Sequence, residues 1–380
     1  MVVSGIDFGN NICYTVIVPV IDNGNDNRSE MRQKVARPTI KEVAAKAEVS
    51  TQTVSRVINE RPDVSPETRK RVQEVIMELG YRPSALARSL IRQRSNTLGV
   101  VTAGLRYIGP SWTLSGIAAA AEEAHYSLLL KELPRFDEND IEPIFQALLS
   151  RHVDGIIWAV PEVGNNHAWI KKSAWNLDIP LVYLTMEPQK DVSIVAIDNY
   201  LGGKMAMSHL LEQGYRKIGH ISGPLDWWES RQRMAAWKDA LKEIGLEAKD
   251  SYFVEGNWSS SSGAQAIEKL FDQYPDMDSI FVANDQMALS VIQFANQKGL
   301  RIPDDLGIVG FDNIAESAFF SPALTTIQQD QFNIAKLAVE EIIKIIEAGW
   351  QESGLIEPRT ILLPPTLVVR QSSLREKNRR

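Results

Sequence analysis

The sequence of 380 residues contains a single cysteine, Cys13, and only five histidines. One cysteine cannot form an intramolecular disulfide, and it excludes cysteine-rich zinc modules. The histidines are scattered, without the spacing of metal ligands. No apolar run reaches the roughly 18 residues that a membrane-spanning helix requires. These absences favour a cytoplasmic protein without a metal ion or other cofactor.

The motifs of common enzymes are also missing. The sequence has no Gly-x-Ser-x-Gly nucleophile elbow and no His-Glu-x-x-His zinc motif. Gly202-Gly203-Lys204 lacks the first glycine of a phosphate-binding loop, and we expect it to belong to the start of a helix. We therefore expect no enzymatic activity.

The first thirty residues differ from the rest of the chain. Gly5-Ile6-Asp7-Phe8-Gly9 resembles the first phosphate-binding hairpin of the actin, Hsp70 and sugar-kinase ATPase fold, but the rest of such an ATPase is missing. No basic residue precedes the apolar stretch 12–21, which argues against a secretory signal. We expect residues 1–36 to be an atypical extension, either non-native or a mis-assigned start, with Met31 as the natural start.

Positive charge is concentrated near the N-terminus. The whole chain has a net charge of −7, which by itself argues against nucleic-acid binding. Residues 32–94, however, hold 14 lysines and arginines against 7 acidic residues, so this segment carries +7 and the remainder carries −14. A solvated linker would explain the basic block, but a nucleic-acid-binding module joined to an acidic body explains the asymmetry better.

The basic block contains the pattern of a helix-turn-helix. Thr39 and Glu42 fit a capping box, and apolar residues follow at helical spacing. Ser50 is a suitable N-cap for a second helix, Thr51–Asn59, whose outward residues are Thr51, Gln52, Ser55 and Arg56. Gln can read adenine and Arg can read guanine in the major groove. A third helix starts at Ser65-Pro66 and ends at Gly80; a generic three-helix bundle with a polar face is the alternative.

The segments Thr39–Ala44, Val49–Asn59 and Gly80–Pro83 resemble the LacI family of bacterial transcription regulators, and the resemblance extends from about Pro38 to Val369. It places Thr51, Gln52 and Arg56 at base-reading positions. It also implies that residues 84–90 form a hinge helix on operator DNA, with Leu90 wedged into the minor groove; a plain linker is the alternative. The full set of expected DNA contacts is Thr39, Ser50, Thr51, Gln52, Thr53, Ser55, Arg56, Asn59, Arg82, Ser84, Ala87 and Leu90.

The acidic body alternates strand and helix patterns, which predicts an α/β fold with parallel sheets. Strands are expected at 98–102, 127–130, 155–159, 181–184, 194–197, 218–222, 279–282 and 306–309. Helices are expected near 113–124, 139–150, 199–213, 229–244, 261–273, 285–298 and 330–347. The resemblance implies two lobes of the periplasmic-binding-protein type, with a ligand between them.

Polar and aromatic side chains follow the predicted strands, where open α/β sheets bind ligands. Guanidinium, amide, carboxylate and indole groups together suit a polyol ring. The resemblance places Arg233, Asn284, Asp312, Trp258 and Gln329 at effector-contacting positions. Tyr107 and Trp112 follow the first strand, and Trp228 is added on its placement alone. Trp258 could instead belong to the core, Asn284 could only cap a helix, and Arg233 could form a surface salt bridge.

The domain boundaries follow from these patterns. We expect a helix-turn-helix domain at 37–82, a hinge at 83–95, a two-lobed effector and dimerisation domain at 96–370, and a basic tail at 371–380. The lobes are predicted at about 96–190 plus 331–358, and 191–330 plus 359–370. The tail has only Leu374 and no leucine heptad, which favours a homodimer over a tetramer.

Together these features predict a sequence-specific DNA-binding transcription regulator, a repressor controlled by a small carbohydrate and acting on a roughly palindromic operator. A purine or nucleoside corepressor is the first alternative, and a solute receptor without DNA function is the second. Thr185 and Ala159 stand where the lactose-binding member of the family has an aspartate and an asparagine, which argues against a β-galactoside ligand.

Overall fold

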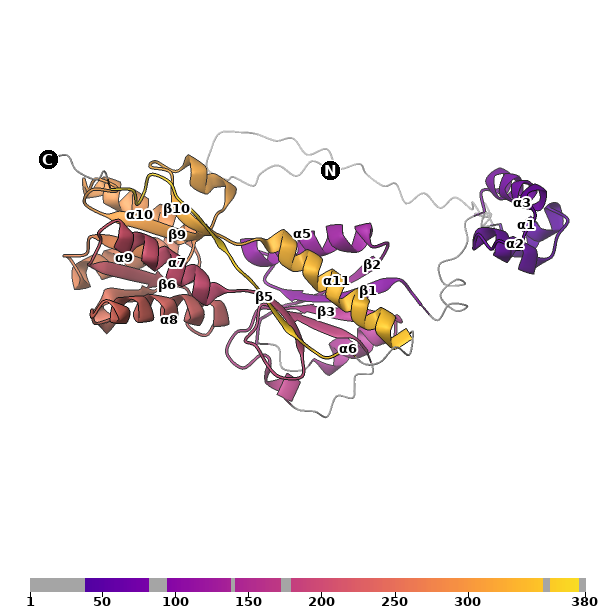
Figure 1. The fold of residues 1–380 in the computed structure, drawn as a ribbon, viewed down its shortest axis with the longest axis horizontal. Helices are drawn as coiled ribbons and strands as arrows, with labels where there is room; N and C mark the ends of the chain where they lie inside the picture. Colours follow the sequence, from indigo (N-terminus) through magenta and orange to yellow (C-terminus); the bar gives the residue numbers. More distant parts are fainter. Residues whose placement is uncertain (1–37, 82–93, 138–140, 172–178, 351–355, 376–380) are drawn as a thin grey trace, which may run out of the picture. The chain divides into compact units, whose positions relative to one another are not determined.

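The computed structural model describes residues 38–81, 94–137, 141–171, 179–350 and 356–375. The chain divides into two compact units, residues 1–84 and 85–380. The first unit is a helical head, and the second is a two-lobed α/β body (Figure 1). No helix in the described part of the chain is long and apolar enough to cross a membrane.

The head consists of α1 (Ile40–Lys46), α2 (Thr51–Ile58) and α3 (Pro66–Leu79). Each helix begins at a hydroxyl side chain that caps a backbone N–H of the first turn, as the sequence predicts. α3 ends at Gly80, whose φ of 60° is the left-handed conformation that suits glycine. The core is formed by Val43, Ala44, Ala47, Val54, Val57, Val72 and Val75.

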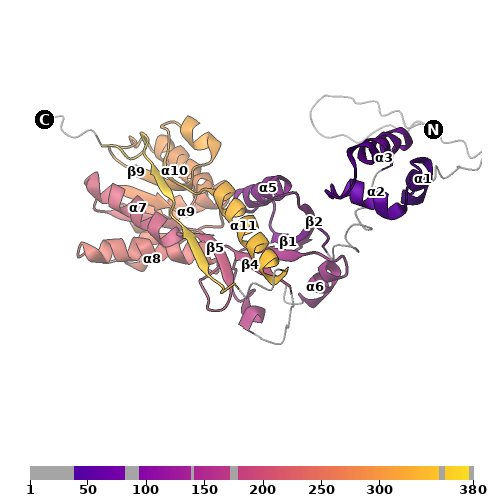
Figure 2. The ribbon, with the colours of Figure 1, turned by 45° about the vertical axis from the view of Figure 1, so that its right-hand side comes forward.

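The first lobe of the body is built on a six-stranded parallel sheet with the order β11-β5-β4-β3-β1-β2. Helices α5 and α11 pack beside each other on one face of it (Figure 2), and α6 packs on the other. Its elements are β1 (Thr97–Ala103), α5 (Ile108–Glu123), β2 (Ser127–Leu133), α6 (Glu142–Leu149), β3 (Gly155–Ala159), η1 (Ala168–Lys171), β4 (Leu181–Leu184), β5 (Ser193–Ile197), α11 (Gln331–Trp350) and β11 (Thr360–Leu363).

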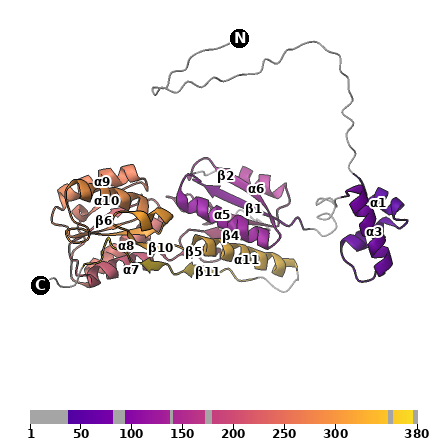
Figure 3. The ribbon, with the colours of Figure 1, turned by 90° about the horizontal axis from the view of Figure 1, so that it is seen from above.

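The second lobe is built on a second six-stranded sheet with the order β12-β10-β9-β8-β6-β7, in which only the β10–β12 pair is antiparallel. Helices α9 and α10 cover one face and α7 and α8 the other (Figure 3). Its elements are α7 (Asn199–Glu212), β6 (Ile218–Ser222), α8 (Trp228–Glu243), η2 (Asp250–Tyr252), β7 (Phe253–Glu255), α9 (Ser260–Gln273), β8 (Ser279–Val282), α10 (Asp285–Gln297), β9 (Gly307–Asp312), η3 (Ala315–Phe319), β10 (Thr325–Gln328) and β12 (Thr366–Val368).

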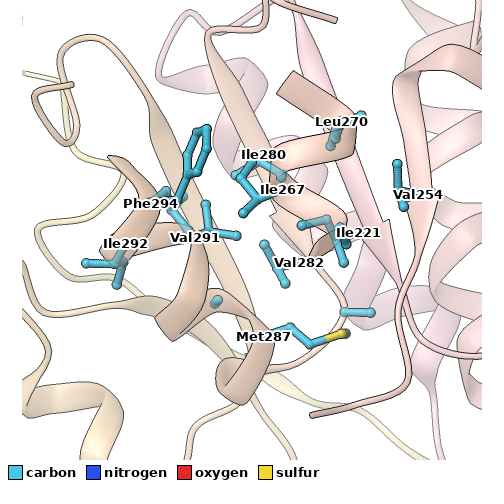
Figure 4. Packing of buried hydrophobic residues seen from close by; sticks show 14 of the residues in the cluster. Ile221, Val254, Ile267, Leu270, Ile280, Val282, Met287, Val291, Ile292 and Phe294 are labelled. Carbon is cyan, nitrogen blue, oxygen red and sulfur yellow. The ribbon is translucent and has the colours of Figure 1, made fainter. Parts of the chain in front are cut away.

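The core between α9, α10 and the second sheet is a dense aliphatic cluster, with side chains such as Ile267, Ile280 and Val291 interdigitating (Figure 4). These residues alternate along the strands and recur at helical spacing along the helices, which is the pattern on which the predictions rested. The cluster includes Val282 and Ala283 at the carboxyl end of β8, next to the cavity-lining residue Asn284.

The lobe boundaries differ from those predicted from the sequence. β5 and β11 both pair in the first sheet, so the chain crosses between lobes near residue 198, at 329–330, and again at 364–365. The sequence predicted two of these crossings at 190/191 and 358/359. The structure moves each of them one strand further along the chain, past β5 and past β11. A boundary set by composition could not find them, because β5 and β11 are apolar like the strands of either lobe.

Candidate functional site

The helix α2 in the head separates buried from exposed side chains. Val54 and Val57 are buried in the head core, whereas Thr51, Gln52 and Arg56 are exposed. Thr53 and Ser55 are half-buried beside them. The residues that the sequence places at base-reading positions thus share the outward side of α2, as entry into a major groove requires.

Two predicted DNA contacts cap helices. The backbone N–H of Glu42 donates to Thr39 Oγ1 at 3.4 Å, and the backbone N–H of Thr39 donates to Glu42 Oε2 at 2.6 Å. In the same way, the N–H of Thr53 donates to Ser50 Oγ at 3.1 Å. These hydroxyls fix where α1 and α2 begin, and therefore which residues α2 presents.

Arg56 and Asn59 lie toward the C-terminal end of α2. Arg56 Nη1 is 3.5 Å from Asp63 Oδ2, and both side chains are about half exposed. An ion pair this exposed contributes little, so a phosphate or base edge can replace it. Asn59 Nδ2 donates to the Ser55 carbonyl at 2.8 Å, which ties it to the last turn of α2. The four predicted hinge contacts, Arg82, Ser84, Ala87 and Leu90, lie outside the described residues.

A cavity of about 710 Å³, including its open mouth, lies between the two lobes of the body. It is lined by residues at or just after the carboxyl ends of β1, β3 and β4 in the first lobe and of β6, β7, β8, β9 and β10 in the second. The carboxyl ends of both parallel sheets therefore meet at one site, as expected for open α/β sheets. The predicted effector residues that line it are Tyr107, Arg233, Trp258, Asn284, Asp312 and Gln329.

Arg233 is 4% exposed and occupies the floor of this cavity. Its Nε donates to Asn199 Oδ1 at 2.9 Å and its Nη1 to the Ala283 carbonyl at 2.5 Å. The guanidinium lies 3.7 Å from the centre of the Phe311 ring and 3.9 Å from Asp312 Oδ1. A surface salt bridge, the alternative for this residue, is excluded by its burial.

Asp312 begins a chain of hydrogen bonds that passes from one lobe to the other. Gln329 Nε2 donates to Asp312 Oδ1 at 2.6 Å, and Gln331 Nε2 donates to Gln329 Oε1 at 3.3 Å. Thr113 Oγ1 on α5 in turn donates to Gln331 Oε1 at 2.8 Å. Burial raises the pKa of Asp312 to about 6, although the Arg233 charge and the Gln329 hydrogen bond act in the opposite direction.

Asn284 both caps a helix and lines the cavity. Its Oδ1 accepts from the backbone N–H of Met287 at 2.9 Å, which starts α10, and its Nδ2 donates to the Trp258 carbonyl at 2.9 Å. Trp258 has a φ of 72° and is 9% exposed within the apolar cluster beside α10. Asn284 thus caps a helix and also lines the cavity, and Trp258 belongs to the core and also lines the cavity.

Aromatic rings from both lobes form one wall. Tyr107 and Phe136 of the first lobe contact Trp227 of the second, with ring centres 5.8 Å and 4.9 Å away. Trp227 also contacts Trp258 at 5.7 Å. Gly223 is needed here, because a Cβ at this position would lie 2.1 Å from the Trp258 ring. Three of these four rings (Tyr107, Trp227 and Trp258) line the cavity.

Two predicted effector residues lie away from the cavity lining. Trp112 is half-buried on α5, and its neighbour Thr113 faces the cavity instead. Trp228 is 4% exposed and packs into the core of the first lobe with residues such as Trp158 and Tyr183, although it belongs to α8 of the second lobe. It therefore holds the two lobes together, and the adjacent Trp227 takes the place at the cavity.

Sequence reasoning missed several lining residues: Thr113, Trp227, Glu229, Gln286 and Gln331. Glu229 and Trp227 lie between the predicted strand at 218–222 and the predicted site residue Arg233, so their proximity to Arg233 was a usable signal. Gln331 starts the helix that follows a crossing between lobes, which the sequence predicts at 330/331 and the structure places at 329–330, so its position was also within reach of the sequence. Within the described residues, no cluster of three or more candidate metal ligands occurs.

The fold and these two sites define a helix-turn-helix regulator with a two-lobed, ligand-binding body. Comparison with known proteins supports this assignment. Residues 39–84 match the family described as bacterial regulatory proteins, lacI family, and residues 207–373 match the periplasmic binding protein-like domain. Catabolite control protein A of Priestia megaterium is 34% identical over 338 residues, which cover 88% of this chain and 99% of that protein.

Solved structures give the same result. A lac repressor dimer bound to operator and the anti-inducer ONPF superposes with a TM-score of 0.78 at 28% identity, covering 89% of this chain and 99% of the other. A complex of the transcriptional regulator CelR with cellobiose gives 0.64 at 29% identity, covering 88% and 100%. The chain belongs to the lacI family of bacterial regulatory proteins. The predicted family, fold class and regulatory, non-enzymatic function are thereby confirmed.

Proposed function

We propose that this regulator binds a roughly palindromic operator as a homodimer and that a small sugar between its lobes controls operator affinity. The observation that carries the proposal is the cavity where guanidinium, carboxylate and amide groups from Arg233, Asp312 and Asn284 meet an aromatic wall. Directed polar groups suit ring hydroxyls, and flat apolar rings suit the face of a pyranose. CelR, which shares the fold, was solved with cellobiose.

The lining also narrows the class of sugar. Thr185 and Ala159 face the cavity at the carboxyl ends of β4 and β3. A hydroxyl and a methyl group offer fewer polar contacts than the carboxylate and amide of the lactose-binding member. We therefore propose a ligand other than a β-galactoside.

The mechanism is a coupling free energy between the cavity and the head. A ligand that binds one arrangement of the lobes better than another shifts the population of arrangements. In the proposed dimer, that shift changes the spacing of the two hinge segments and with it the minor-groove contact of Leu90. The hydrogen-bond chain from Asp312 to Thr113 runs between the lobes, so a ligand that competes for Gln329 also acts on the lobe arrangement.

The test is selection from random DNA duplexes at fixed salt, with and without a panel of sugars and nucleosides. Salt must be fixed because phosphate contacts make affinity fall steeply with ionic strength. We expect enrichment of one palindrome whose binding changes in the presence of a sugar. Loss of binding identifies an inducer, and binding only with ligand identifies a corepressor.

A purine or nucleoside is the second candidate, and the aromatic wall favours it specifically. Indole rings such as Trp227 and Trp258 stack on a nucleobase as well as on a sugar. A response to nucleosides alone would replace the sugar with a base. Absence of any enriched sequence would overturn the regulatory function and leave a ligand-binding module.

A further inference from the structure

Glu229 is a buried carboxylate at the cavity, in addition to the groups of Arg233, Asp312 and Asn284 that are proposed to bind sugar hydroxyls. It lies in the first turn of α8, lines the cavity, and is 7% exposed. Its Oε2 has less than 1 Å² of exposed surface and no hydrogen-bond partner. Buried carboxylates are normally paired or hydrogen-bonded, because removing their charge from water is costly. An unpaired carboxylate at a ligand cavity therefore indicates a partner that arrives with the ligand.

The two nearby cations are engaged elsewhere. Arg231 Nη2 donates to Glu162 Oε1 at 2.9 Å, and its Nη1 donates to the Asp226 carbonyl at 2.9 Å. Arg233 donates to Asn199 and Ala283 and faces Asp312. Arg231 is paired with Glu162 and Arg233 with Asp312, so in the described part of the chain neither guanidinium forms an ion pair with Glu229, although both charges lower the pKa of its carboxyl.

The aromatic wall adds a second argument. Tyr107, Trp227 and Trp258 line the same cavity, and the faces of aromatic rings attract cations. Arg106 already lies over the Tyr107 ring at 5.0 Å and Arg233 over the Trp258 ring at 5.5 Å, so the ring face of Trp227 and the Glu229 carboxylate are the groups complementary to a further positive charge. Arg233, Asn284 and Asp312 line the same cavity, and each has more hydrogen-bonding capacity than its internal contacts use, which suits ring hydroxyls.

We infer that the effector is an amino sugar, a pyranose whose protonated amine pairs with Glu229. The inference rests on the proposed sugar-binding function and names the chemical class of the ligand. Burial raises the pKa of Glu229 to about 7; the neighbouring Glu162 charge raises it further, while its own backbone N–H and the charges of Arg233 and Arg231 lower it. An arriving ammonium stabilises the ionised carboxylate, so binding of an amino sugar slightly below pH 7 releases a proton from Glu229.

The test is isothermal titration calorimetry on the full chain. The probes are glucosamine, galactosamine and mannosamine, each compared with its neutral parent sugar and its N-acetyl derivative. We expect at least one amine to bind ten times more tightly than both neutral counterparts. Slightly below pH 7 its observed enthalpy should depend on the ionisation enthalpy of the buffer, as proton release requires, whereas the enthalpy of a neutral sugar should not.

Two variants make the test specific. Glu229→Gln keeps the shape of the side chain and removes its charge, so we expect the tenfold preference and the buffer dependence to disappear. Glu268→Gln, on the exposed side of α9, is the matched control and should retain both. Preservation of the amine preference in Glu229→Gln would overturn the inference.

The remaining outcomes separate this inference from the proposed function. If a neutral sugar or a nucleoside binds more tightly than every amine and changes operator affinity, the amino-sugar assignment fails and the cavity-controlled regulator stands. If no sugar or nucleoside binds or affects operator affinity, both fail.

Discussion

We propose that single exposed residues on α2 decide which DNA sequence the head reads. Arg56 is exposed beside Gln52, and only a weak ion pair with Asp63 holds it. The alignment of Thr51, Gln52 and Arg56 on one side of α2 follows directly from helical periodicity, and the sequence predicts it well.

Arg56→Ala should reduce operator affinity by about 1–3 kcal/mol and relax specificity at one base pair, because a bidentate contact with guanine is lost. The measurement is binding to the selected duplex and to its single-base variants at fixed salt. Lys46→Ala, which removes an exposed partner of Glu78, is the control and should leave base preference intact. An equal loss on every duplex would contradict base reading by Arg56.

Asp285 illustrates a buried polar residue that serves the fold. It is fully buried, and it accepts hydrogen bonds from Thr326 Oγ1 at 2.5 Å and from the Ile314 backbone N–H at 3.0 Å. Burial, with a contribution from the Asp312 charge, raises its pKa to about 8. The folded body therefore holds a proton that the unfolded chain releases at lower pH.

This difference predicts that the body becomes less stable as pH rises from about 6.5 to 8, by about 1–2 kcal/mol. The buried His167 and His220, whose pKa values burial lowers to about 4 and about 3, are neutral in the folded body throughout this window but about half protonated in the unfolded chain at pH 6.5, so each offsets about 0.4 kcal/mol of this loss. Glu229 adds in the same direction up to about pH 7. Urea unfolding followed by tryptophan fluorescence measures the body, because all nine tryptophans lie between residues 112 and 350.

Asp285→Asn should flatten this pH dependence, and the exposed Asp272→Asn should not. A pH dependence between 6.5 and 8 that Asp285→Asn leaves unchanged would show that Asp285 is ionised in the folded protein throughout this range.

At the scale of elements, the close packing of α7 against α8 positions Arg233. A Cβ at Gly203 of α7 would lie 2.6 Å from the Cβ of Ala236 and 3.2 Å from the Arg233 carbonyl. Gly203 therefore permits an approach that any other residue prevents, which a sequence pattern of Gly-Gly inside a helix suggests but cannot assign to a partner.

Gly203→Ala should destabilise the body by about 1–3 kcal/mol through overpacking, and it should weaken ligand binding because α8 carries Arg233. Gly349→Ala near the end of α11, where nothing lies within 4 Å, should be neutral or stabilising by up to about 1 kcal/mol. Urea unfolding and ligand titration of both variants provide the measurement, and equal stabilities would contradict the packing argument.

The sequence predicts long, periodic elements better than short ones. The expected helices near 199–213 and 261–273 match α7 and α9 closely. β7, β10, β11 and β12 were not predicted, although the four-residue strands β4 and β8 were. β4 and β8 are almost wholly buried apolar runs, whereas β7, β11 and β12 lie at sheet edges and are partly exposed, so their apolar pattern is weaker.

For the whole molecule, the separation of charge along the chain was the decisive sequence signal. A basic segment of about sixty residues on an acidic body indicates a DNA-binding head on a body that does not itself attract DNA. The cleft was harder to predict, because its lining comes from eight strand ends and from the crossing at 329–330, which only the folded structure brings together. Trp227 and Trp228 illustrate this difficulty. They are adjacent at the start of α8, yet Trp227 lines the cavity whereas Trp228 packs into the core of the first lobe.

The most direct test of the central claim is operator affinity at fixed salt as a function of sugar concentration. The account predicts a change of about 5–150-fold at saturation, the usual range of coupling between two sites. It also predicts that Tyr107→Leu, which removes one ring of the aromatic wall, shifts the response to higher sugar concentration. An operator affinity that stays constant while a sugar demonstrably fills the cavity would contradict the account.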